Sequence, residues 1–143
     1  MKGLIGSALF MSAMLIFAGC DVYQKEKRPH IRYGKDRCIT CGMIISEERF
    51  AAASDTADGH FAKFDSIGCL VLYRKKSQFP VERAWVHDGE GGEWMRARDA
   101  FFVKSQEIMT PMGDGLLAFK TRESAERFSM GKNAQVLSFE ELK

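Results

Sequence analysis

An apolar leader at the start of the chain limits the folded part of the protein to the residues behind it. Lys2 gives the leader a short positive start, and an apolar run broken only by glycine and serine extends from Leu4 to Ala18. The run is short for a membrane span and ends in small residues before Cys20, which is the pattern of an export signal. The stretch "FAGC", residues 17–20, matches a bacterial lipobox loosely at its first position and well at the other three. We therefore predict a lipoprotein-type signal peptide over residues 1–19 and lipid attachment at Cys20.

An uncleaved anchor in which Cys20 is incidental is the alternative to this interpretation. Both place the rest of the chain outside the cytoplasm, in the cell envelope. With lipid on Cys20, the protein is held on the extracytoplasmic, periplasmic side of a bacterial membrane. Asp21 follows the lipidated cysteine directly, and an aspartate there favours the inner membrane in some bacteria.

Removal of the leader leaves 124 residues, which is enough for one compact domain with a modest core. Because Lys2 leaves with the leader, the mature chain has 20 basic and 19 acidic side chains. This near-neutral balance argues against a nucleic-acid partner. Residues 20–36 are polar and charged, with little apolar periodicity, and we interpret them as the lipidated N-terminus and a flexible tether. Residues 37–143 form the predicted domain.

Apolar periodicity predicts an α+β fold for this domain. Asp65 is a good helix N-cap, and Thr121 is a second one before a helix that Gly131 ends. The predicted strands are residues 49–55, 60–65, 82–88, 97–105, 115–121 and 134–142, the last with a few residues beyond the strand proper, and the predicted helices run from 65 to about 75 and from 122 to 129.

Two blocks of the sequence are alike. "FDSIGCLVLY", residues 64–73, and "FKTRESAERF", residues 119–128, each run from a phenylalanine at a strand end, through a polar cap, into a helix with an aromatic residue nine positions on. We expect two small strand-helix-strand halves that form a pseudo-repeat. Coincidence between two short amphipathic helices is the alternative.

Three cysteines remain after lipidation, Cys38, Cys41 and Cys69, and the first two lie in "CITCGM", residues 38–43. An odd number cannot be used up by intramolecular disulfides, so at least one thiol is free or bound to something. A redox C-x-x-C pair needs its first cysteine at a helix N-terminus after a strand, and here the upstream segment is charged tether. A structural zinc site needs four ligands, which Cys69 with His60 or His87 would complete. Both interpretations stay open as alternatives.

A soft monovalent ion such as Cu(I) needs only two or three thiolate or thioether ligands, and "CITCGM" supplies them locally. Gly42 is free to adopt the backbone angles of a tight turn that aims the sulfur atoms inward. Methionine discriminates between the ions, because a thioether has no proton to lose and zinc gains little from it. Met43 follows the thiols, and Met109 and Met112 occur in "IMTPMGDG", a loop where a core-packing role is harder to argue; for Met112 the ligand and packing roles are about equally supported.

The order of these motifs resembles the NosL family of nitrous oxide reductase accessory proteins. The resemblance covers Cys38 to Leu142 and rests on "CITCGM", "FDSIGC", "WVHD", "EWMRARDAFFV", "PMG", "AERF" and "VLSFEEL", taken together and in this order. It implies a membrane-tethered copper chaperone, not an enzyme, that holds Cu(I) and hands it to nitrous oxide reductase. An ABC-type transporter complex is the docking partner that the resemblance implies.

The resemblance also implies particular ligands. Family members place a cysteine two residues before a methionine, matched here by Cys41 and Met43, and a later methionine before a glycine, matched by Met112. Cys38 and Cys69 are extra thiols relative to members that carry a single mature cysteine. The expected Cu(I) ligands are Cys38, Cys41, Met43 and Met112, and no histidine is selected. A structural zinc-binding or thiol-redox lipoprotein that acts as an interaction module is the alternative function.

Overall fold

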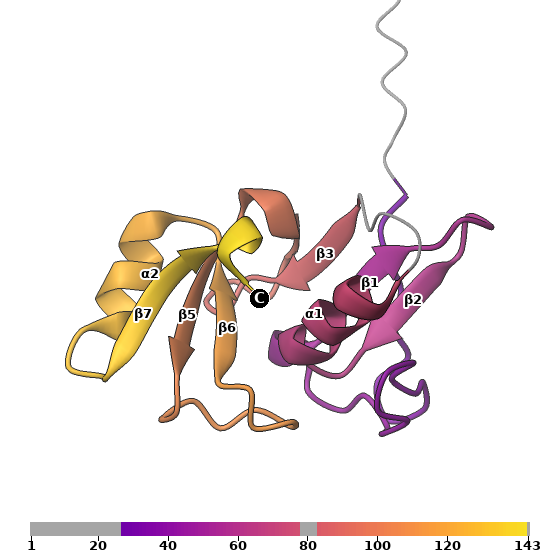
Figure 1. The fold of residues 1–143 in the computed structure, drawn as a ribbon, viewed down its shortest axis with the longest axis horizontal. Helices are drawn as coiled ribbons and strands as arrows, with labels where there is room; N and C mark the ends of the chain where they lie inside the picture. The colour runs from indigo at the N-terminus through magenta and orange to yellow at the C-terminus, as the bar shows by residue number, and fades with distance from the viewer. Residues whose placement is uncertain (1–26, 78–82, 143) are drawn as a thin grey trace, which may run out of the picture.

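The computed structural model describes residues 27–77 and 83–142 of the chain. These residues form two antiparallel sheets, each with one helix packed against it (Figure 1). The mixed α+β fold expected from the sequence is confirmed. No helix within the described residues is long and apolar enough to cross a bilayer. The predicted signal peptide and the lipidation site Cys20 lie outside the described residues.

The first sheet has four strands and carries the longer helix. Its strands have the order β2-β1-β3-β4 and are all antiparallel. The elements are β1 (Ala52–Asp55), β2 (Phe61–Phe64), α1 (Ile67–Lys76), β3 (Ala84–His87) and β4 (Trp94–Arg96).

The cap of α1 differs from the sequence prediction by one residue. Ser66, not Asp65, is the N-cap, and its side chain accepts a hydrogen bond from the backbone N–H of Cys69 at 3.2 Å. Serine and aspartate cap helices about equally well, so local sequence does not decide between neighbours. The prediction for Asp65 was wrong, and its carboxylate is free for another role.

The second sheet has three strands and carries the shorter helix. The elements are β5 (Phe101–Ser105), β6 (Leu116–Phe119), α2 (Arg122–Ser129) and β7 (Ala134–Ser138), with the strand order β6-β5-β7. Helix α2 has the predicted bounds, and the Thr121 side chain caps it by accepting from the N–H of Ser124 at 3.1 Å.

Both halves use the same connection. A hairpin leads into a helix, and the strand after the helix pairs with the first strand of the hairpin, in the orders β2-β1-β3 and β6-β5-β7. The two strand-helix-strand units expected from the sequence are therefore present. That the two units are repeats in sequence stays a prediction.

Several strand boundaries differ from the predicted ones because short 3-10 turns interrupt the alternating pattern. Three short 3-10 helices lie where strand was predicted: Glu48–Phe50, Ala97–Asp99 and Phe139–Glu141. The strands predicted over 49–55 and 97–105 therefore start later, and the strand predicted over 134–142 ends at Ser138. Strand β4, three residues long, was not predicted.

One core joins the two halves. The larger cluster of buried side chains includes Phe64, Ile67 and Leu70 from the first half together with Phe102 and Phe139 from the second. A smaller cluster fills the space between α2 and its own sheet. Near the shared core, the Arg74 guanidinium on α1 donates to the carbonyl oxygens of Phe139, at 3.1 Å, and Leu142, and stacks over the Phe139 ring. This shared packing holds the loops of the two halves in a fixed relation.

Candidate metal centre

The "CITCGM" segment forms a closed turn. The N–H of Cys38 donates to the carbonyl of Met43 at 2.8 Å, and the N–H of Gly42 donates back to the carbonyl of Cys38 at 2.9 Å. Gly42 has φ of 78°, a left-handed conformation that only glycine adopts without strain. The role expected for Gly42 is thus realised, and the turn brings Cys38 and Cys41 to one side.

Contacts on both flanks fix this turn to the rest of the domain. The N–H of Ile39 donates to the carbonyl of Lys63 on β2 at 3.0 Å. Just before the turn, the buried Asp36 carboxylate is bound by Lys63 at 2.6 Å and by Arg32 at 2.7 Å. These donors hold the pKa of Asp36 well below its usual range, the backbone N–H of Arg32 contributing most. The turn is therefore fixed to β2 by a backbone hydrogen bond from Ile39 and by the ion pair between Asp36 and Lys63.

Helix α1 brings a third cysteine to the same place. Cys69 lies in the first turn of α1, and its carbonyl accepts from the Thr40 hydroxyl at 3.1 Å. Four ligand atoms, one each from Cys38, Cys41, Cys69 and Asp65, all lie within 4.8 Å of one another. Cys38, Cys69 and Asp65 are almost fully buried, while Cys41 is partly exposed. All three thiols are free.

Asp65 faces this group of thiols from the end of β2. Its Oδ1 accepts a hydrogen bond from the Cys41 thiol at 3.4 Å, and its Oδ2 has no hydrogen-bond partner although the residue is 1% exposed. A buried carboxylate oxygen without a partner carries a desolvation penalty that a nearby cation removes. Three soft sulfur atoms beside this oxygen therefore form a donor set suited to a metal ion.

The thiols of Cys41 and Cys69 are protonated in the metal-free protein at neutral pH, because the pKa of each is raised. Burial raises the pKa of Cys41 and outweighs the lowering effect of the backbone hydrogen bond from Met43, while hydrogen bonds with Cys38 and Asp65 raise the pKa further. Burial also raises the pKa of Cys69, far above the usual range of a thiol. A metal that binds here as a thiolate complex must displace protons, so its affinity depends on pH.

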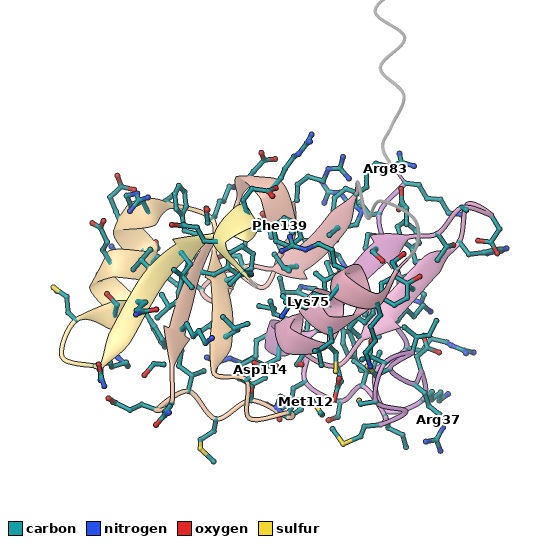
Figure 2. All side chains as sticks on the ribbon, in the orientation of Figure 1. Arg37, Lys75, Arg83, Met112, Asp114 and Phe139 are labelled. Atoms are coloured by element: carbon teal, nitrogen blue, oxygen red, sulfur yellow. The ribbon has the colours of Figure 1, made fainter. Side chains whose placement is uncertain are left out.

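The two methionines expected as ligands are both partly exposed. Met43 ends the turn and is 40% exposed; Met112, on the loop between β5 and β6, is 42% exposed. Met112 and Cys69 line the same cavity of about 270 Å³ between α1 and the second half. Figure 2 labels Met112 and Asp114 on the loop that extends from β5 and β6 toward α1.

Asp114 ties this loop to the start of α1. Its Oδ2 accepts from the N–H of Gly68 at 3.1 Å, and its Oδ1 accepts from the Thr110 hydroxyl and the N–H of Leu116, both at 3.0 Å. Gly68 leaves just enough room, since a Cβ there would lie 2.4 Å from Asp114 Oδ2. The contact places Met112 beside the helix turn that carries Cys69.

The structure brings Cys38 and Cys41 together as expected and adds two residues that sequence reasoning did not select. The sequence predicted Asp65 as a helix cap, and it presented Cys69 only as an extra thiol relative to other family members and as a ligand of the alternative zinc site. The available signal was their closeness in sequence, since Asp65 lies just before the helix and Cys69 lies in its first turn.

None of the three histidines joins the cluster. His30 and His60 are exposed. His87 is buried, where its Nε2 lies 2.9 Å from the Tyr33 hydroxyl and its Nδ1 lies 2.7 Å from the carbonyl oxygen of Gly92. The zinc alternative, in which a histidine completes the ligand set, therefore finds no histidine at this place.

Comparisons with known proteins agree on one family. A family model described as NosL matches residues 31–143. The copper-binding lipoprotein NosL of Stutzerimonas stutzeri is 23% identical over an alignment of 153 residues that covers 96% of this chain and 80% of that protein. The crystal structure of the copper chaperone NosL from Shewanella denitrificans superimposes with a TM-score of 0.72 at 20% identity, covering 82% of this chain and 97% of that one.

Proposed function

Because this chain belongs to the NosL family, we propose that it is a copper chaperone that carries Cu(I) to nitrous oxide reductase during assembly of its copper centres. The observation that carries the proposal is the meeting of three thiols within 4.8 Å of one another. The half-exposed Met43 follows the two thiols of the turn in sequence, and the half-exposed Met112 lines the same cavity as Cys69. A binding role without catalysis agrees with the names of both relatives, a copper-binding lipoprotein and a copper chaperone.

Cu(I) is the ion that these donors suit best. Thiolate and thioether sulfur atoms prefer a soft, monovalent ion, and Cu(I) needs only two or three such ligands. We assign Cys38, Cys41, Met43 and Met112 as ligands, with Cys69 as a further thiolate within reach of the first two. The positive ion also offsets the unpartnered oxygen of Asp65.

The difference in exposure between the ligands suggests how the ion is released. Cys38 is 2% exposed, whereas Met43 and Met112 are 40% and 42% exposed. An incoming protein therefore meets the two neutral thioethers first. An under-coordinated Cu(I) ion accepts a ligand from the acceptor before it loses one of its own, so transfer proceeds as ligand exchange.

We place the protein on the extracytoplasmic side of a bacterial membrane, attached through lipid on Cys20. Support comes from the leader pattern of residues 1–20 and from the Stutzerimonas relative, which is a lipoprotein. Nitrous oxide reductase acquires its copper outside the cytoplasm, so chaperone and acceptor share this compartment. An ABC-type transporter complex of the same assembly pathway is the proposed docking partner.

Metal competition tests the assignment of the cargo. The full-length protein, purified reduced and without oxygen, is titrated with Cu(I) and with zinc against a chelator of known affinity for each. We expect about one Cu(I) per chain and much weaker zinc binding, with tight Cu(I) binding lost in Cys41→Ser. Tight zinc binding, with loss of folding on chelation, contradicts the proposal.

Two further experiments test delivery and attachment. Copper-loaded protein is mixed with copper-free nitrous oxide reductase, which should gain copper and activity faster than from free Cu(I) buffered to the same level. Cys20→Ser should release the protein from membranes or leave the precursor uncut. A Cys20→Ser protein that is still cut after Gly19 and stays membrane-bound contradicts the lipid anchor.

A further inference from the structure

A groove runs from the thiol cluster along α1. The cavity of about 270 Å³ between α1 and the second half is lined mainly by apolar surface, including Leu72 and Met112. Gly68, Leu72 and Lys75 follow the spacing of one helix face, so the groove extends along that face of α1. Cys69, at the start of the helix, forms part of the wall.

Two lysines make this groove positive. Lys75 on α1 and Lys104 on β5 both line it and are exposed, and neither makes an ion pair within residues 27–77 and 83–142. Among the described residues, Asp114 is the only carboxylate that lines the groove, and its oxygens already accept from the N–H of Gly68 on α1, the Thr110 hydroxyl and the N–H of Leu116. An apolar groove with unpaired lysines fits an occupant that brings carboxylates of its own.

We propose that this groove receives an extended segment of the copper-accepting protein, one that carries a soft donor and acidic residues. This inference rests on the proposed function and adds the chemistry of the acceptor. The soft donor enters beside Met112 and Cys69, where it can take the ion, and the carboxylates pair with Lys75 and Lys104. Apolar side chains of the segment cover Leu72.

The distance between Cys69 and Lys75 along α1 sets the spacing between the soft donor and the first carboxylate of that segment. Six residues separate Cys69 from Lys75, so the two positions lie about 9 Å apart along the helix axis. An extended chain covers that distance in about three residues. The acceptor segment therefore has its soft donor and its first carboxylate about three positions apart.

A short peptide probes the groove directly. We would use a fluorescent peptide with a methionine, two glycines and then two aspartates, and a second peptide with asparagines in place of the aspartates. Binding to the full-length protein in detergent is followed by fluorescence anisotropy, with and without Cu(I). The test variant is Lys75→Glu with Lys104→Glu. Lys76→Glu with Lys120→Glu is the control, since it changes the net charge equally and neither residue lines the groove.

The acidic peptide should bind more tightly than the asparagine peptide and lose roughly tenfold in affinity in the test variant, since two ion pairs become repulsive. The control variant should lose much less, and the Cu(I) affinity should stay the same in both. Equal loss in the two variants, or no preference for the acidic peptide, overturns the inference.

Anionic headgroups offer carboxylate-like charge as well. Vesicles of phosphatidylglycerol are therefore tested beside vesicles of phosphatidylcholine. Binding to the former that depends on Lys75 and Lys104, without binding of the acidic peptide, overturns the inference in favour of a lipid surface. Failure of the parent protein to bind Cu(I) contradicts the proposed function instead, and it leaves the peptide comparison measurable in metal-free protein.

Discussion

Replacing Gly68 by alanine should move the loop that carries Met112 away from the start of α1, where Cys69 lies. A Cβ at this position would lie 2.4 Å from Oδ2, 2.6 Å from Cβ and 2.7 Å from Cγ of Asp114, which are distances that no real contact allows. Asp114 would have to move, and the loop that carries Met112 would move with it. The hydrogen bond from the N–H of Gly68 would be lost.

The expected cost follows from three contributions. Overpacking typically costs about 1–3 kcal/mol, and loss of a hydrogen bond to a charged group costs about 1.5 kcal/mol or more. Alanine regains up to about 1 kcal/mol over glycine in a helix. The net loss is about 2–3 kcal/mol, which at a typical urea m-value of about 2 kcal/mol/M lowers the unfolding midpoint by about 1–1.5 M.

Urea unfolding and a Cu(I) titration measure the two consequences. Gly68→Ala should lower the midpoint and weaken Cu(I) binding. In an Asp114→Gly background the obstructing side chain is absent, so the same substitution should be neutral or slightly stabilising. A parent-like midpoint for Gly68→Ala, or an equal loss in both backgrounds, would refute the contact between Asp114 and the helix start.

Three more outcomes are expected. Met112→Leu should weaken Cu(I) binding in a competition titration, and it should lower the stability by less than about 1.5 kcal/mol. Met109→Leu is the control, since Met109 lies on the same loop and is 85% exposed, and it should bind Cu(I) as the parent does. Equal affinities for the parent and both variants exclude Met112 as a ligand. Cu(I) affinity should fall as pH falls through the neutral range, because the raised pKa of the Cys41 thiol means that binding displaces a proton; a flat profile contradicts thiolate coordination. Because the pKa of Asp36 is lowered in the fold, its carboxylate should stabilise the protein above about pH 5 and lose this contribution as the pH falls below that value. The urea midpoint of Asp36→Asn should therefore change less between about pH 7 and pH 3 than that of the parent. Parallel profiles for the two proteins would show that the Asp36 carboxylate contributes nothing to stability.

Local sequence predicted helix α2 more closely than the strands of either half. Helix α2 has its expected bounds because Thr121 caps it and its polar and apolar residues alternate with helical spacing. The strand starting at Phe101 was predicted four residues too early, since "ARD" alternates like a strand but forms a 3-10 turn. Strand β4 is only three residues long, which is too short to show a period.

Some residues of the site could be predicted from local sequence, and the others come together only in the folded domain. Cys38 and Cys41 were predicted together because four residues of turn join them, and Gly42 takes the conformation that its lack of a side chain allows. Asp65 and Cys69 lie more than 20 residues further along and meet the turn only through packing of α1 against the first half. The sequence predicted Asp65 as the helix cap, whereas in the structure Ser66 caps the helix and the Asp65 carboxylate faces the thiols.

X-ray absorption at the copper edge tests the central claim most directly, that Cu(I) is held by sulfur atoms from both halves of the domain. The full-length protein is loaded with one Cu(I) without oxygen, and the nearest neighbours of the ion are counted in the parent and in Met112→Leu. We predict an edge typical of Cu(I) and a nearest shell of sulfur atoms alone, with one sulfur fewer in the variant. A shell of oxygen or nitrogen atoms, or the same number of sulfur atoms in both proteins, would contradict a copper site divided between "CITCGM" and the loop of Met112.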